Sequence, residues 1–259
     1  MTGASSGIGL AYAQRLAHDG RDVILVARRQ ERLEELAQSL RADAGVDVVV
    51  LSADLTDREA LLRVERAIEE REGLDFVVNC AGFGGYRPFI DLPADEAEEL
   101  IQLHITALTR ITRAALPGMV ARNGGAIVNV ASLLAFSASA PAPPLPFRAV
   151  YAAAKSYIVT FSEIVAAEVR DAGVLVQALC PGIVATEFHD VRGLRMNARS
   201  SGMAPDAVVE ASLAGVRAGE VICIPPLEDR AFVERYATSR TALLQFARST
   251  EIAERYSEK

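Results

Sequence analysis

The sequence has no apolar run that approaches the ~20 residues an α-helix needs to cross a bilayer. Its N-terminus lacks the basic region and following apolar core of a secretory signal. No lysine- and arginine-rich block interrupts the acid excess, and the formal net charge is −7. We therefore expect a cytoplasmic protein that binds neither nucleic acid nor an anionic membrane.

Cysteine and histidine are also scarce. Cys80, Cys180 and Cys223 each lie in an apolar or strand-like segment and form no C-x-x-C pair, so we expect buried, reduced thiols. The three histidines form no ligand cluster with these cysteines at metal-binding spacing. The sequence therefore predicts no metal site.

What is abundant is apolar sequence in a regular order. With 259 residues and 51% hydrophobic content, the chain fits one α/β domain over residues 1–259. Helical spacing of apolar residues covers 8–17, 29–42, 57–70, 94–122 (interrupted near Pro117), 149–171 and 205–218. Short apolar runs typical of buried strands cover 22–27, 46–53, 74–79, 126–131, 174–179 and 221–224. This alternation predicts a doubly wound parallel sheet in three layers, α/β/α.

A glycine-rich turn, TGASSGIG, opens the first predicted helix. Gly3 permits a tight turn, Gly7 a close approach of backbone to a pyrophosphate, and Gly9 a close packing of the helix on the sheet. The free N–H groups at the start of the helix would face the anion. The predicted phosphate contacts are Gly3, Ser5, Ser6, Gly7, Ile8 and Gly9.

The strongest chemical constellation is Ser132, Tyr151 and Lys155. Tyr151 and Lys155 are four residues apart in a predicted helix and therefore share a face. We expect the ammonium to lower the pKa of the phenol, so that Tyr151 exchanges a proton near neutral pH. Ser132 follows a predicted strand, at the sheet edge where ligands of such folds bind. Taken alone, a Tyr-x-x-x-Lys pair is more often a surface tyrosine beside a solvated lysine.

Together these motifs resemble the short-chain dehydrogenase/reductase family over nearly the whole chain, and the resemblance implies a Rossmann-type fold. Asn79-Cys80-Ala81-Gly82 is similar to the family's Asn-Asn-Ala-Gly turn, and Pro181-Gly182-Ile183 with Thr186 to its Pro-Gly-x-x-x-Thr segment. By resemblance, the further cofactor contacts are Asn79, Ala81, Gly82, Pro181, Gly182, Ile183, Thr186, Asp54 and Leu55. Asp54 has an alternative role in forming the turn before Thr56.

The resemblance also implies the catalytic roles. Tyr151 is the acid/base, Ser132 orients the carbonyl, and Lys155 holds the nicotinamide ribose and lowers the pKa of the tyrosine. His104 occupies the family's fourth catalytic position, normally asparagine. The imidazole either binds water or relays a proton, or it is a structural histidine between helices, and the sequence leaves both open.

Two further departures concern chain length. In the family a strand that lies mid-sheet precedes the glycine turn, whereas here only Met1 does. We therefore expect that the natural product carries an apolar segment upstream. The interval from Ser132 to Tyr151 is also longer than usual, with the surplus in residues 137–146, which would form either a wall of the substrate pocket or a solvated loop.

Charge suggests the cofactor. NAD-selective relatives place an acid at the end of the second strand, but here Ala27 is followed by Arg28 and Arg29. Guanidinium groups suit a ribose 2′-phosphate, so we expect NADP(H). The alternative is that both arginines merely open a solvated helix.

These features predict hydride transfer between nicotinamide and a carbonyl or secondary alcohol. The rival is a catalytically silent nucleotide-binding or regulatory protein of the same fold. Residues 187–204 are the expected substrate lid, and 228–259 form a C-terminal helical extension. An apolar pocket for a small-molecule substrate is expected from Phe83, Leu133, Phe136 and Phe188. The resemblance implies a homodimer or homotetramer formed through 94–122 and 149–171.

Overall fold

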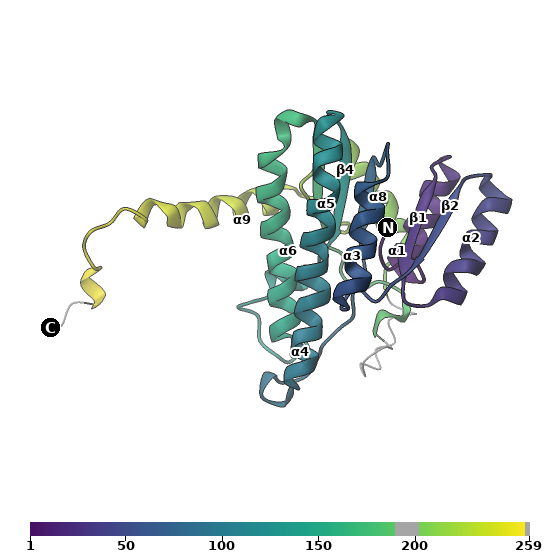
Figure 1. The fold of residues 1–259 in the computed structure, drawn as a ribbon. Helices are drawn as coiled ribbons and strands as arrows, with labels where there is room; N and C mark the ends of the chain where they lie inside the picture. The colour runs from purple at the N-terminus through teal and green to yellow at the C-terminus, as the bar shows by residue number, and fades with distance from the viewer. Residues whose placement is uncertain (190–201, 257–259) are drawn as a thin grey trace. The chain divides into compact units, whose positions relative to one another are not determined.

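The computed structural model describes residues 1–189 and 202–256 (Figure 1). It contains two compact units, Met1–Pro225 and Pro226–Lys259. The first unit contains the sheets, the helices on both faces of them and all of the predicted site residues. It is therefore the unit in which the site is built.

All strand pairings in the first unit are parallel. The strands are β1 (Val23–Ala27), β2 (Val48–Ser52), β3 (Phe76–Asn79), β4 (Gly125–Val130), β5 (Val174–Leu179) and β6 (Ile222–Cys223). β1 pairs with β2, with Val23 opposite Val48, and a second sheet has the order β3-β4-β5-β6. The expected parallel α/β arrangement is confirmed, with strand ends within two residues of the predicted ones.

Met1 and Thr2 lie between β1 and β3. The Val26 amide donates to the Met1 carbonyl and the Thr2 amide donates to the Val78 carbonyl, each at 2.9 Å. The chain therefore joins the two sheets through these two residues, at the position where the sequence predicts a preceding strand. The glycine turn follows directly at the carboxyl ends of β1 and β3.

Helices cover both faces of the sheets and form two cores (Figure 1). One core uses α1 (Gly7–His18), α2 (Gln30–Ala44) and α8 (Pro205–Arg217), and the other uses α3 (Arg58–Glu69), α5 (Leu108–Ala121) and α6 (Ala149–Glu168). Leu33, Leu36 and Leu40 of α2 point inward as the helical spacing predicts. Burying one such side chain stabilises the fold by about 1.5–3 kcal/mol.

The long helical region before β4 differs from the prediction. α4 (Ala94–Ile101) and α5 are joined by a π-helical turn, Gln102–Ala107, and Pro117 lies inside α5 without ending it. The expected interruption near Pro117 is therefore wrong, and the irregular turn lies around His104 instead. Single π-helical turns of this kind are frequent at functional sites.

The second unit is described by itself. It contains α9 (Ala231–Ala242) and two short 3₁₀ turns, Leu243–Phe246 and Glu254–Tyr256, and no residue of these three elements is buried. Its large exposed apolar side chains are Phe232, Leu243, Leu244, Phe246, Ile252 and Tyr256. Within the described part of the chain, no helix is long and apolar enough to cross a bilayer.

Candidate active site

The glycine turn forms a cradle that side chains would fill. Gly3 and Gly7 have φ values of +69° and +57°, where L-residues are strained. A Cβ on Gly9 would lie 2.3 Å from the Gly3 carbonyl oxygen, and one on Gly7 would lie 3.0 Å from Thr186 Cγ2. The turn therefore leaves backbone exposed at the start of α1, which fits the pyrophosphate of a dinucleotide.

Thr2 connects this cradle to the turn after β3. Its Oγ1 accepts hydrogen bonds from the Cys80 and Ala81 amides, both at 3.0 Å. A Cβ on Gly3 would lie 3.0 Å from the Ala81 nitrogen, so only glycine allows this approach. Thr2 is a site residue that sequence reasoning missed, although its position at the head of the glycine turn was the available signal.

Asn79 lies in the interior, although the resemblance implied a cofactor contact. Its amide nitrogen donates to Thr112 Oγ1 at 3.1 Å and to Asn129 Oδ1 at 2.9 Å. Asn129 in turn donates to Ser162 Oγ at 3.0 Å. The Asn79 side chain therefore links β3 to β4 and α5, because a buried amide must find partners inside the protein.

Ser132, Tyr151 and Lys155 come together as predicted. Lys155 Nζ donates to the Val130 carbonyl at 2.8 Å and lies 5.5 Å from the centroid of the Tyr151 ring. The Ser132 hydroxyl is close enough to the Tyr151 phenol to act on its pKa, and its Oγ accepts from the Leu134 amide at 3.2 Å. Tyr151 and Lys155 are 5% and 4% exposed, so this is not the solvated surface pair of the alternative interpretation.

Burial governs the protonation of this group. It raises the pKa of Tyr151 well above its usual value; the neighbouring Tyr86 raises it further, and the Ser132 hydroxyl opposes the shift only in part. Burial likewise lowers the pKa of Lys155 to about 8. The expected lowering of the Tyr151 pKa is therefore wrong for the chain itself, because burial, which disfavours the phenolate, is the largest cause of the shift.

His104 is buried in the π-helical turn and faces the same group. Its Nε2 lies 2.9 Å from the Phe83 carbonyl oxygen and 3.4 Å from the Phe83 amide nitrogen; because a carbonyl can only accept, the shorter contact favours an N–H on Nε2. Its ring stands edge-on to Tyr151, with centroids 5.6 Å apart. Burial, and then the Lys155 charge, hold the pKa of His104 well below its usual value, so the imidazole is neutral at physiological pH.

A cavity of about 10 Å³ adjoins His104 and is lined by Lys155 and Asn79 among others. His104 Nδ1 and Asn79 Oδ1 are both buried, and neither has a hydrogen-bond partner within the described part of the chain. The volume is close to that needed for a single water molecule. His104 is therefore buried, as its structural interpretation requires, and it lines this water-sized cavity, while its role toward a water or a proton stays a prediction.

An aromatic and aliphatic wall surrounds Tyr151. The Tyr86 and Phe188 rings lie 5.3 and 6.1 Å from the Tyr151 ring. The wall contains Phe83, Tyr86, Leu100, Leu103, Leu134, Val150 and Phe188. Phe83 and Phe188 are thus placed as predicted, whereas sequence reasoning missed Tyr86, for which its position just after the Asn-Cys-Ala-Gly turn was the only signal.

Leu133 and Phe136 do not belong to this wall. Phe136 packs on a separate core cluster that includes Ile158 and Cys180, and Leu133 lies close to Gly182. Both residues lie in one 3₁₀ turn, Leu133–Phe136, so only Leu134 faces Tyr151. A loop sequence does not reveal which side chains of a turn point toward one another, and the part of Leu133 and Phe136 in a substrate pocket stays a prediction.

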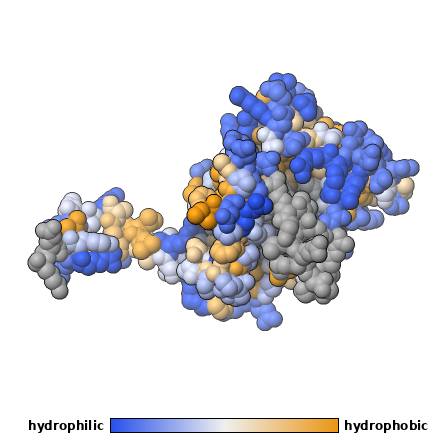
Figure 2. Space-filling view, turned by 90° about the horizontal axis from the view of Figure 1, so that it is seen from below, coloured by the Kyte–Doolittle hydropathy of each residue, from blue (hydrophilic) through white to orange (hydrophobic). Residues whose placement is uncertain are grey.

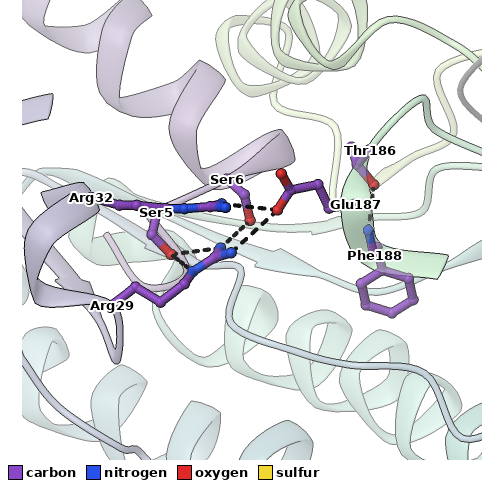
Figure 3. A network of polar contacts seen from close by, with 7 residues as sticks. All are labelled: Ser5, Ser6, Arg29, Arg32, Thr186, Glu187 and Phe188. Carbon is purple, nitrogen blue, oxygen red and sulfur yellow. Dashed lines mark hydrogen bonds and ion pairs between the residues drawn. The ribbon is translucent and has the colours of Figure 1, made fainter. Parts of the chain in front are cut away.

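Arg28 and Arg29 have different environments, of which Figure 3 shows that of Arg29. Arg29 donates to Ser5 Oγ at 2.9 and 3.1 Å and to Ser6 Oγ at 2.7 Å, so it lies beside the phosphate cradle. Arg28 Nη1 is 3.8 Å from an Asp54 carboxylate oxygen. Arg29 is therefore the better placed of the two predicted cofactor arginines.

Asp54 occupies the turn assigned to it by the alternative interpretation. Its Oδ1 accepts from the Thr56 amide at 3.0 Å and from Thr56 Oγ1 at 2.7 Å. Partial burial opposes ionisation, but the bonds from Thr56 and the Arg28 charge hold the pKa of Asp54 below its usual value. Leu55 is buried and lines the small cavity.

The Pro-Gly segment borders the cradle from the other side. The Pro181 carbonyl accepts from the Leu133 amide at 2.9 Å, and Ile183 is 45% exposed. Thr186 lies next to Gly7, where a Cβ would come within 3.0 Å of its Cγ2. Of the predicted lid, residues 190–201 lie outside the described residues.

The long segment before Tyr151 is held by a buried arginine that the sequence analysis did not single out. Arg148 donates to Ser137 Oγ and O, both at 2.7 Å, to the Ala140 carbonyl at 2.8 Å and to the Pro146 carbonyl at 2.9 Å. The segment therefore folds back on Arg148, the residue before α6. Half of the ten residues 137–146 are exposed, as the interpretation as a solvated loop predicts, and a role as a pocket wall stays a prediction.

Comparison with known proteins gives consistent matches. The family model described as short chain dehydrogenase matches residues 1–196. A short chain dehydrogenase of Pseudocercospora fijiensis is 35% identical over 73% of this chain and 60% of its own length. A very-long-chain 3-oxoacyl-CoA reductase of Anas platyrhynchos is 34% identical over 74% of this chain and 61% of its own length. The match thus spans about three fifths of these relatives.

Solved structures match over more of the chain. A short-chain dehydrogenase from Sphingobium yanoikuyae in complex with NADPH is 36% identical, with a TM-score of 0.92, covering 99% of this chain and 98% of that one. A bulky-bulky ketone specific alcohol dehydrogenase from Comamonas testosteroni is 31% identical, with a TM-score of 0.88, covering 100% and 97%.

Proposed function

Because the chain belongs to the short-chain dehydrogenase/reductase family, we propose that it is an NADP(H)-dependent oxidoreductase that interconverts a carbonyl compound and a secondary alcohol. The observation that carries this proposal is the buried pair of Tyr151 and Lys155, with the half-buried Ser132 next to Tyr151, beside the glycine cradle. The Arg29 guanidinium beside that cradle supports the choice of NADP(H) over NAD(H).

When bound, the nicotinamide would supply or accept the hydride. The Ser132 hydroxyl orients the substrate oxygen, and the Tyr151 phenol gives that oxygen a proton during reduction or takes one during oxidation. A raised pKa keeps Tyr151 protonated at neutral pH, which suits it to carbonyl reduction. Lys155, anchored on the Val130 carbonyl, would hold the nicotinamide ribose.

The wall around Tyr151 indicates the substrate class. Tyr86, Phe188, Leu134 and Val150 give the site an apolar surface, so we propose ketones with apolar substituents. The Comamonas relative, described as specific for bulky-bulky ketones, agrees with this choice. We further propose a cytoplasmic homo-oligomer.

The proposal is tested by following NADPH and NADH absorbance with a panel of ketones and aldehydes. We expect oxidation of NADPH by apolar ketones and at least a ~100-fold loss of kcat in Tyr151→Phe, with NADPH binding retained. Tyr157→Phe, on the same helix and bonded to Thr109, is the matched control and should keep its activity. NADPH binding without turnover by any carbonyl would favour a silent nucleotide-binding protein.

A further inference from the structure

Glu187 lies between two arginines at the edge of the phosphate cradle (Figure 3). Its Oε2 accepts from Arg32 Nη1 at 2.9 Å and from Arg29 Nη1 at 3.2 Å. The Phe188 amide donates to Thr186 Oγ1 at 3.3 Å, a local turn that includes Glu187. One carboxylate oxygen therefore bridges two cations that lie on and just before α2.

The Arg29 side chain is held in place independently of Glu187. Its Nε and Nη2 groups bond to Ser5 and Ser6 of the cradle, which leaves Nη1 for the carboxylate. The bonds from Arg32 and then Arg29 hold the pKa of Glu187 below its usual value, so the carboxylate is charged at neutral pH. The pair of arginines is thus a preformed anion site next to the cradle.

We propose that Glu187 is a specificity-determining residue whose carboxylate occupies the place between Arg29 and Arg32 that the ribose 2′-phosphate of NADP would take. The inference rests on the proposed cofactor. Glu187 competes with this phosphate and lowers the affinity for nucleotides that carry it. Nucleotides without a 2′-phosphate leave the carboxylate where it is, and their affinity does not depend on it.

Physical chemistry favours this exchange. Carboxylate and phosphate oxygens accept the same guanidinium hydrogen bonds, and a phosphate brings more charge and more acceptors. The Arg29, Arg32 and Glu187 side chains are 42%, 46% and 40% exposed. Ion pairs this exposed are weak, so a phosphate can displace the carboxylate. A buried pair would instead keep the site closed.

The experiment compares two nucleotides that differ in the 2′-phosphate alone. Binding of adenosine 2′,5′-bisphosphate and adenosine 5′-monophosphate is measured by calorimetry on the full chain and on Glu187→Gln. We expect the variant to bind the bisphosphate about three- to tenfold more tightly and the monophosphate equally well. NADPH binding, followed by its fluorescence, should tighten by the same factor.

Two variants make the result specific. Asp75→Asn removes one negative charge from an exposed ion pair with Arg21. Arg21 precedes β1 and Asp75 precedes β3, so this pair lies at the edge of the sheets opposite the cradle. The variant should change the affinity for neither nucleotide. Adding Arg32→Gln to Glu187→Gln should weaken bisphosphate binding again. Circular dichroism of each variant checks that it is folded.

Other outcomes overturn the proposal. Weaker bisphosphate binding by Glu187→Gln would mean that the carboxylate supports the site. Unchanged binding, or equal gains for both nucleotides or in Asp75→Asn, would mean that Glu187 does not compete for the phosphate. If the unmodified chain binds neither nucleotide, the proposed cofactor is wrong and this inference is wrong with it. If the unmodified chain binds both nucleotides but Glu187→Gln does not bind the bisphosphate more tightly, only the role of Glu187 is wrong.

Discussion

Tyr151 and Lys155 lie one helical turn apart, and their environment favours the neutral form of both side chains. Burial disfavours the charged form of each, so the pKa of the phenol rises and that of the ammonium falls to about 8. His104 is shifted in the same way and is neutral. At this scale the apolar surroundings, more than the pairing of charges, set the protonation states.

The pH dependence of turnover should follow Tyr151. Alcohol oxidation needs the phenolate, which is scarce below a raised pKa, so its rate should rise with pH by up to tenfold per unit from about pH 6 to about pH 9. Carbonyl reduction needs the phenol and should stay constant until Lys155 loses its charge near pH 8. Initial rates in both directions across this range measure the effect.

His104→Asn serves as the control for this pH profile. Since His104 is already neutral, the asparagine variant should retain the shape of both curves. A profile that loses an inflection near pH ~6.5 in this variant would show instead that the imidazole titrates during turnover.

Among the elements, the segment from Ser137 to Arg148 shows how a long loop can be ordered by one side chain. Its proline-rich sequence carries no helix or strand pattern, yet three backbone carbonyls accept from the Arg148 guanidinium. Arg148 directly precedes α6, which carries Tyr151 and Lys155. The loop and the start of the helix that carries Tyr151 therefore share a support.

Replacing Arg148 by methionine should destabilise the fold by about 2–3 kcal/mol, because buried carbonyls lose charged donors. We also expect kcat to fall, since the start of α6 would be less well held. Chemical unfolding and steady-state rates measure the two effects. Arg63→Met, at an exposed position on α3, is the matched control and should change neither stability nor kcat. An Arg148→Met variant with unchanged stability and kcat would show that Arg148 does not support the loop and α6.

For the molecule as a whole, two groups of exposed apolar side chains stand out among the described residues. In the first unit, a groove of about 710 Å³ is lined by Phe89, Ile90 and Ile101 among others, where α4 begins and ends. Figure 2, seen from below, shows apolar surface among polar residues on this side. In the second unit, the described helical elements bury no residue. Such surface is typical of interaction sites, which supports the proposed homo-oligomer.

The second unit should contribute to association rather than to the folding of the first, which has its own cores. A chain ending at Pro225 should therefore keep its thermal midpoint within a few degrees, while its assembly state becomes smaller than that of the full chain. Light scattering coupled to size-exclusion chromatography measures the latter. An unchanged assembly, or loss of the folded state, would be the contrary result.

Sequence pattern determined the α/β class and most helices and strands, and together with the family resemblance it identified the glycine turn and the residues Ser132, Tyr151 and Lys155. These depend on residue periodicity and spacing, which are local and are therefore read from order along the chain. Leu33, Leu36 and Leu40 illustrate this, because helical spacing alone turns them inward.

Tertiary structure decided the rest. It put the Asn79 amide in the interior, assigned Arg29 rather than Arg28 to the cradle, and raised the pKa of Tyr151 although a lysine lies beside it. It also brought Glu187 to Arg29, 158 positions away in the sequence. Burial and contact between distant segments arise only when the chain has folded, so no local pattern encodes them.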